Sequence, residues 1–150
     1  MMDVRSYVAV VLAGVLTGSE LTSWGVVHPT LWKLEHRAQV HAEKLMYRRF
    51  ASVDPFLMTA TVAACFVAAA ASGGGRAALV LAGGGCFACM LAITWLGNMP
   101  INVRVFRWDE EGGDPGEWRR IRRRWDGFHT ARIVLDVAGF LLVSAALARS

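Results

Sequence analysis

The sequence predicts an all-α integral membrane protein that folds as one four-helix bundle. Hydrophobic residues make up 55% of the 150 residues, more than the about 45–50% typical of soluble domains, and the mean hydropathy is +0.38. Several apolar stretches approach the roughly 20 residues that a helix needs to cross a bilayer. We expect a single domain, residues 1–150, with spans at about 6–27, 52–72, 77–97 and 129–148.

The connection between the first two spans, residues 28–50, is polar but rich in helix-forming residues. Leu31, Leu34, Val40 and Leu45 give it a loose apolar stripe. This pattern predicts an additional helix between the first two spans, either amphipathic at the membrane interface or cytoplasmic.

The other two connections differ in length. Residues 72–76 contain three consecutive glycines, which predict a tight turn between the second and third spans. The third connection, residues 98–128, is long and polar, with a turn at 112–116 and a short helix expected at 117–126, before the last span. We find no internal repeat, and antiparallel spans with short links favour an up-down bundle.

Lysine and arginine gather in the two longer connections, 28–50 and 98–128. The positive-inside rule therefore predicts that both connections are cytoplasmic and that both termini lie outside a bacterial-type inner or plasma membrane. The net charge of +4 fits contact with anionic lipid headgroups better than binding to nucleic acid. The basic run 119–124 is interpreted in the same way, as a topology anchor.

Ionisable residues on the first span indicate a polar site, because a charge at the bilayer centre costs roughly 2.5–3.5 kcal/mol on insertion scales. Glu20, Trp24 and His28 fall within about an 80° sector of an α-helix at about 100° per residue. Since a residue before proline avoids the α conformation, we expect the span to end at His28-Pro29. The structural alternative is that Glu20 is protonated or hydrogen-bonded and that His28 is an interfacial cap.

The last span carries a second ionisable group, His129, Arg132 and Asp136, on one helix face. Arg132 and Asp136 are spaced for an i, i+4 ion pair, which is either purely structural or part of a site. Under the predicted topology His129 lies at the same level as His28. The two histidines could then share a site with a general base tuned by its neighbours.

Amide and indole side chains lie near the same membrane face. Asn98 and Asn102 flank a proline at the expected end of the third span, where they either cap the helix or hydrogen-bond a substrate oxygen or oxyanion. The tryptophans form an interfacial belt or stack on a flat aromatic ligand. The candidate substrate-binding residues are Trp24, Trp95, Asn98, Trp125 and Asp136.

Metal and thiol chemistry stay open as alternatives. Glu20, His28 and His129, and less favourably His41 and Glu43, offer the nitrogen and oxygen ligands that suit iron or copper, although no compact metal motif is present. Cys86 and Cys89 form a CxxC pair in the third span, with Cys65 in the second. Redox activity is one interpretation of that pair, and small-residue helix packing is the other.

Several of these elements together resemble one family. The elements are a small-residue first span that carries a Glu and leads into His28-Pro29, a charged helix that ends in Tyr47-Arg-Arg-Phe50, the segment Asn98-Met-Pro-Ile-Asn102, and the series Trp125, His129, Arg132. They resemble the anthrone oxygenase-like family of small four-helix membrane proteins over nearly the whole chain. The CxxC pair departs from that pattern.

The resemblance implies an oxidoreductase of polyketide pathways that oxidises an anthrone to a quinone with O₂ as co-substrate, with either no cofactor or a single iron or copper ion. A base would remove the acidic benzylic proton, and hydrogen-bond donors would hold the resulting oxyanion. On this resemblance His28 or His129 is the base, Asn102 and Arg132 stabilise the oxyanion, and Glu20 orients a histidine or binds a metal.

Other functions compete with oxidation. The same intramembrane charges suit a non-enzymatic bundle that binds or transports a small lipophile or a proton. A thiol redox protein using Cys86 and Cys89 is a further alternative. The expected partners are the lipid bilayer and a small hydrophobic aromatic substrate, and the small-residue spans permit a homodimer.

Overall fold

The computed structural model describes residues 3–149, and within them it contains helices and turns but no strand. The helices are α1 (Val4–Thr22), η1 (Ser23–Val27), α2 (His28–Leu31), α3 (His36–Ala70), α4 (Gly74–Ile93), η2 (Thr94–Asn98), α5 (Met99–Phe106) and α6 (Pro115–Leu147), where η1 and η2 are π-helical. The all-helical prediction is confirmed.

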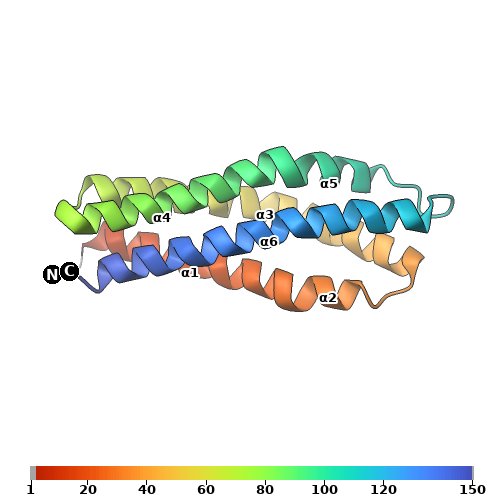
Figure 1. Cartoon of the computed structure of the whole chain (residues 1–150), viewed down its shortest axis with the longest axis horizontal. Helices are drawn as coiled ribbons and strands as arrows, with labels where there is room; N and C mark the ends of the chain where they lie inside the picture. The colour runs from red at the N-terminus through yellow and green to blue at the C-terminus, as the bar shows by residue number, and fades with distance from the viewer. Residues whose placement is uncertain (1–2, 150) are drawn as a thin grey trace.

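Each continuous helical rod runs the length of an elongated bundle (Figure 1). The rods are α1–η1–α2, α3, α4–η2–α5 and α6, and within the described residues these four are long and apolar enough to cross a membrane. The two termini lie together at one end of the bundle, while α2 and α5 lie towards the other (Figure 1). The predicted four-helix membrane bundle is therefore confirmed.

Local sequence explains where the rods begin and turn. Asp3, Glu35 and Asp114 each accept hydrogen bonds from backbone N–H groups of the helix that follows, as N-cap residues do. The glycine turn after α3 leads into Gly74, the first residue of α4, whose φ of 54° lies in the left-handed region that favours glycine.

Two buried clusters divide the core along the bundle axis. One cluster is built mainly from small and aliphatic side chains of α1, α3, α4 and α6, including Ala13, Cys65 and Val143. The other lies toward the opposite end and is rich in aromatic side chains, including Tyr47, Trp118 and Trp125.

The second cluster corrects the expectation of an interfacial helix. The predicted amphipathic segment is helical, but it is the first half of the 35-residue α3 and continues directly into the second span. Val40 and Tyr47 are buried in the aromatic cluster rather than facing a membrane surface. At about 1.5 Å per residue, a helix of this length exceeds the roughly 30 Å hydrocarbon core, so the bundle continues beyond the bilayer.

The short helix predicted at 117–126 is likewise the start of the 33-residue α6. Its face towards the bundle carries Trp118, Ile121, Arg122 and Trp125, all of them buried. Packing of this face against α3 and α5 keeps the helix continuous.

We had expected proline to end the first and third rods, but both rods continue past it as helices. In each rod a π-helical segment comes first, and the proline then occupies the first turn of the next α-helix, Pro29 in α2 and Pro100 in α5. A proline at this position leaves its missing N–H without consequence. The wider π-turn accommodates the irregular backbone, so both rods stay helical.

The two interruptions share a sequence pattern, Ser or Thr, then Trp, then four residues, then Pro. It covers residues 23–29 and 94–100, and it marks η1–α2 and η2–α5. The sequence thus holds a short repeat that we did not recognise by inspection, and it places two π-turns in two of the rods.

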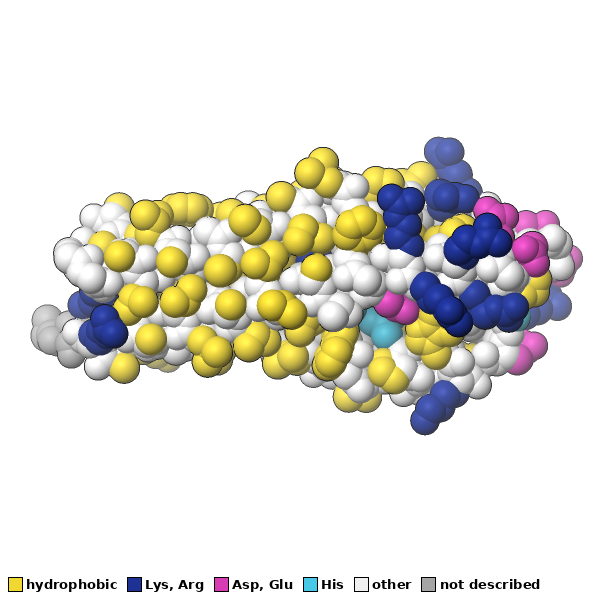
Figure 2. All heavy atoms as spheres, viewed as in Figure 1, with side chains coloured by type: hydrophobic (Ala, Val, Ile, Leu, Met, Phe, Trp, Pro, Cys, Tyr) yellow, Lys and Arg dark blue, Asp and Glu magenta, His cyan; other side chains and the backbone are white. Residues whose placement is uncertain are grey.

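The surface divides into an apolar and a charged part. Hydrophobic side chains cover the part of the bundle that carries the termini, and Lys and Arg gather at the end that carries α2 and α5 (Figure 2). Exposed apolar side chains such as Val8, Phe66 and Leu141 suit contact with lipid. This arrangement identifies a membrane protein.

Candidate functional site

A cavity of about 330 Å³ lies where the apolar and charged parts of the bundle meet. Its walls come from α1, α3, α6 and the η2–α5 region, and they combine aromatic and aliphatic side chains with a small ionisable group. Pockets for small molecules have this composition, with few polar groups in an apolar wall. The five candidate catalytic residues all line it: Glu20, His28, Asn102, His129 and Arg132.

Arg132 and Glu20 form the central ion pair of the site. The guanidinium Nη2 of Arg132 donates to Oε1 of Glu20, across the gap between α6 and α1. The second carboxylate oxygen of Glu20 lies 3.4 Å from Nδ1 of His129. All three side chains are buried, with at most 6% of any exposed, so Glu20 connects the charge of Arg132 to the imidazole of His129.

The expected ion pair between Arg132 and Asp136 does not form. Asp136 is fully buried, but no cation among residues 3–149 lies within ion-pair distance of it, and its neighbouring polar groups are Thr17 and Arg132. Arg132 pairs instead with Glu20, because this contact between α6 and α1 neutralises the buried Glu20.

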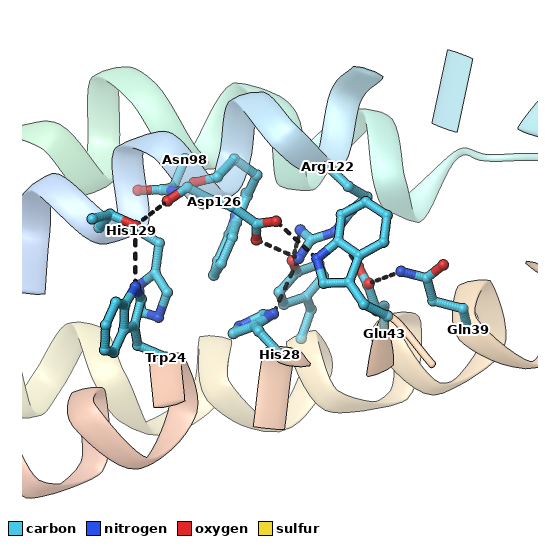
Figure 3. A network of polar contacts seen from close by, with 12 residues as sticks. Trp24, His28, Gln39, Glu43, Asn98, Arg122, Asp126 and His129 are labelled. Atoms are coloured by element: carbon cyan, nitrogen blue, oxygen red, sulfur yellow. Dashed lines mark hydrogen bonds and ion pairs between the residues drawn. The ribbon is translucent and has the colours of Figure 1, made fainter. Parts of the chain in front are cut away.

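His28 forms a hydrogen bond with Arg122. Its Nδ1 atom lies 3.1 Å from Nη2 of Arg122, and Figure 3 shows the two side chains facing each other between α2 and α6. A guanidinium carries only donors, so Nδ1 of His28 must accept. His28 is therefore the neutral tautomer that carries its proton on Nε2.

Arg122 is a buried residue next to the site that the sequence interpretation missed. It is fully buried, its Nε lies 2.6 Å from Oε2 of Glu43, and its Nη1 donates to the hydroxyl of Tyr47. Gln39 donates to the other oxygen of Glu43 at 3.0 Å. We had interpreted Arg122 as part of a basic topology anchor that contacts lipid headgroups. It lies seven residues before His129, on the same helix face, and that spacing could have revealed it.

Trp125 packs against both histidines and orients an amide of the site. Its ring lies 4.6 Å from that of His28 and 4.7 Å from that of His129, measured between centroids. Its indole N–H donates to Oδ1 of Asn102 at 2.8 Å. This bond fixes the orientation of the amide, whose NH₂ group makes only a weak contact, 3.8 Å to the sulfur of Met99. The Asn102 NH₂ group thus remains available to a ligand.

Of the five predicted substrate-binding residues, two line this cavity and three do not. Trp95 and Trp125 line the cavity. Asn98 is buried behind Trp125 and donates to its backbone carbonyl at 3.3 Å, and Asp136 does not line the cavity either. Trp24 lines a second cavity, which His28 and His129 also line, and its indole donates to the hydroxyl of Thr130 at 3.1 Å.

Three of the potential metal ligands, Glu20, His28 and His129, line the same cavity. Among residues 3–149, no group of three His, Cys, Asp or Glu side chains is placed to hold a metal ion. His41 lies at the surface beside Glu110, and Glu43 is paired with Arg122. We therefore derive no step through a metal.

The cysteines lie away from the site. Cys65, Cys86 and Cys89 are free thiols, and none of them lines either cavity. Cys65 is buried in the small-residue core, and Cys89 is exposed on the outer side of α4.

These features define a membrane protein of four helical rods whose polar site opens into an aromatic-walled cavity. The family model described as anthrone oxygenase matches residues 43–142, so the chain belongs to the anthrone oxygenase family, as the sequence motifs had suggested. The match includes Asn102, Trp125, His129 and Arg132, whereas Glu20 and His28 precede it. No curated protein and no solved structure matches the chain.

Proposed function

We propose that the protein is a membrane oxygenase that oxidises a hydrophobic, anthrone-like polycyclic ketone with O₂. The observation that carries the proposal is the buried relay from Arg132 through Glu20 to His129 at the wall of an aromatic cavity. A cavity of about 330 Å³ is at the small end of the range for organic ligands, which suits a compact molecule of three fused rings.

His129 acts as the base in this proposal. The carboxylate of Glu20 faces Nδ1, which favours the tautomer with the proton on Nδ1 and a free lone pair on Nε2. Neither ring nitrogen of His129 makes a hydrogen bond within residues 3–149. Because Nδ1 faces the carboxylate of Glu20, we assign Nε2 as the nitrogen that takes the benzylic proton of the substrate.

Donors around the cavity stabilise the anion that forms. When the proton leaves, negative charge moves to the ketone oxygen, and Arg132, His28 Nε2–H and the NH₂ group of Asn102 are the available donors. His129 and Arg132 are three residues apart in α6, which is a rise of about 4.5 Å at about 1.5 Å per residue. That spacing is comparable to the separation of the reacting carbon from the ketone oxygen across the central ring.

The overall reaction balances without a further reductant. The carbanion donates two electrons to O₂ and forms a carbon–oxygen bond, and the protonated base returns its proton to give a hydroperoxide on the substrate. Loss of water from that hydroperoxide then forms the second carbonyl. One oxygen atom enters the quinone and the other leaves as water.

The mouth of the cavity suits a substrate that arrives from the membrane. Phe56 and Trp95 both line the cavity and are 75% and 55% exposed. Aromatic side chains exposed on an apolar surface are in contact with lipid rather than with water. A lipophilic ketone dissolved in the bilayer thus reaches the cavity without crossing the charged end of the bundle.

The test is turnover of anthrone by the purified protein in lipid nanodiscs, followed as O₂ uptake and anthraquinone formation and corrected for oxidation without protein. We expect His129→Ala to lower kcat by about 10²- to 10⁴-fold, whereas the surface variant His41→Ala keeps the parental rate. Elemental analysis of the same sample measures bound iron or copper. Parental turnover by His129→Ala would refute the proposed base, and ligand binding without turnover would favour a binding or transport protein.

A further inference from the structure

Asp54 of α3 also lines the cavity. It lies directly before Pro55, half-buried, in a stretch of α3 whose neighbours Phe50 and Phe56 line the same cavity. A further acid beside these two aromatic side chains needs a chemical reason, because a carboxylate without a partner in apolar surroundings is destabilising.

The hydrogen bonds of the other polar groups in the wall are mostly accounted for. Glu20 is paired with Arg132, the hydroxyl of Tyr47 accepts from Arg122, and the hydroxyl of Thr94 donates to a backbone carbonyl. Asp54 interacts electrostatically with Arg132 and Glu20. Within the described residues, however, its carboxylate takes part in no hydrogen bond or ion pair. A ligand in the cavity would therefore meet an unused acceptor.

The position of Asp54 determines which part of a ligand it would meet. His129 and Arg132 approach the cavity from α6, while Asp54 approaches it from α3. A flat ligand with its central ring against His129 then presents an outer ring to α3. The group best suited to a carboxylate there is a neutral O–H donor, which forms a charge-assisted hydrogen bond and still allows the ligand to dissolve in lipid.

We propose that Asp54 accepts a hydrogen bond from a phenolic hydroxyl on an outer ring of the substrate and so selects hydroxylated polycyclic ketones over unsubstituted ones. This inference rests on the proposed function for its substrate class. The relevant hydroxyl is at a ring position that is not adjacent to the ketone. A hydroxyl beside the ketone is already hydrogen-bonded to the ketone oxygen within the molecule.

The test compares paired ligands that differ only in this hydroxyl. For turnover the pair is 3-hydroxyanthrone and anthrone. For binding it is 2-hydroxyanthraquinone and anthraquinone, followed by quenching of tryptophan fluorescence at a pH where the hydroxyl keeps its proton. Binding of the quinones needs no chemistry, so it tests Asp54 even if neither ketone is turned over.

We expect Asp54→Ala to weaken binding of 2-hydroxyanthraquinone by about tenfold to a hundredfold, the range for a hydrogen bond to a charged group. Binding of anthraquinone should change by less than about twofold on the same scale. Asp54→Asn keeps an acceptor without the charge and should give an intermediate loss. Glu111→Ala removes an exposed acid that pairs only with exposed Arg37, and it should leave both ligands unaffected.

The ratio between the two ligands decides the outcome. An equal loss for both ligands in Asp54→Ala, or no loss for either, would overturn the role of Asp54 in selection. A wild-type protein that discriminates between the quinones through Asp54 but oxidises neither ketone would contradict the proposed reaction and leave the role of Asp54 in place.

Discussion

Nη2 of Arg122 lies 3.1 Å from Nδ1 of His28, although 94 residues separate the two in the chain. The same guanidinium neutralises Glu43, contacts Tyr47 and lies over the ring of Trp125, with its central carbon 4.5 Å from the ring centroid. One buried arginine therefore joins the aromatic core at the charged end of the bundle to the histidine at the cavity wall (Figure 3).

Removal of Arg122 alone should destabilise the fold more than removal of the whole ion pair. Arg122→Met leaves Glu43 buried without a cation, and we expect it to lower the free energy of unfolding by about 3–5 kcal/mol. The double variant Glu43→Met/Arg122→Met replaces the buried pair with apolar side chains and should recover the part of that loss caused by the unpaired Glu43. Asp126, which lies 3.4 Å from Arg122, loses its partner in both variants. Circular dichroism during denaturant unfolding in micelles measures both, and a double variant as unstable as the single one would contradict the argument.

Arg132 should be coupled to Glu20 and not to Asp136. Double-mutant cycles with Arg132→Gln, Glu20→Gln and Asp136→Asn separate the two pairs. For Arg132 with Glu20 we expect a coupling free energy above about 1 kcal/mol, as for residues in contact. For Arg132 with Asp136 we expect less than about 0.5 kcal/mol. The reverse order in unfolding measurements would restore the ion pair within α6 that the spacing had suggested.

Close packing of α4 on α6 should depend on Gly83. A Cβ atom added there would lie 2.6 Å from Cγ2 of Val143 and 3.0 Å from the carbonyl oxygen of Gly139. We therefore expect Gly83→Ala to be destabilising by about 1–3 kcal/mol. Gly85→Ala is the matched control, since nothing lies within 4 Å of its added Cβ, and it should be neutral or slightly stabilising. Thermal unfolding of the two variants provides the comparison.

Asp114 should make the start of α6 sensitive to acid. Hydrogen bonds from the backbone N–H groups of Gly116 and Glu117, both 3.0 Å, lower the pKa of Asp114 below its ordinary 3.8. Because the folded-state pKa is lowered, this stabilisation is present above about pH 3.8 and is lost as the pH falls through the folded value.

The matched variant is Asp114→Asn, which keeps a capping oxygen but has no charge. We expect the wild type to be more stable than this variant at neutral pH and the difference to vanish in acid, as measured by helicity against pH. A difference that is independent of pH would show that the charge plays no part.

The orientation of the bundle in the membrane is a prediction from sequence that a reporter fusion can test. The termini lie at the end opposite the gathered arginines and lysines (Figures 1 and 2). The positive-inside rule then predicts an external C-terminus. Alkaline phosphatase fused after residue 150 should be active in bacterial cells, and a fusion within 107–114 should be inactive. The opposite pattern would invert the topology.

Sequence patterns were sufficient for the coarse architecture and for much of the site. The length and apolarity of the spans depend on local composition, so they predicted four membrane rods without any knowledge of packing. His28, His129, Glu20 and Arg132 stood out because ionisable residues are rare in apolar helices. Their shared place at one cavity followed from helix periodicity together with antiparallel topology.

Tertiary structure decided the partners. The i, i+4 spacing in the sequence predicted an ion pair between Arg132 and Asp136. In the structure Arg132 pairs with Glu20, and this contact neutralises buried charges on both α6 and α1. The packing of the helices also buries Arg122, although it belongs to the basic run 119–124, and it places Asp54 at the cavity wall. Composition determines which residues are costly to bury, whereas only the packing of the helices determines which residue compensates each of them.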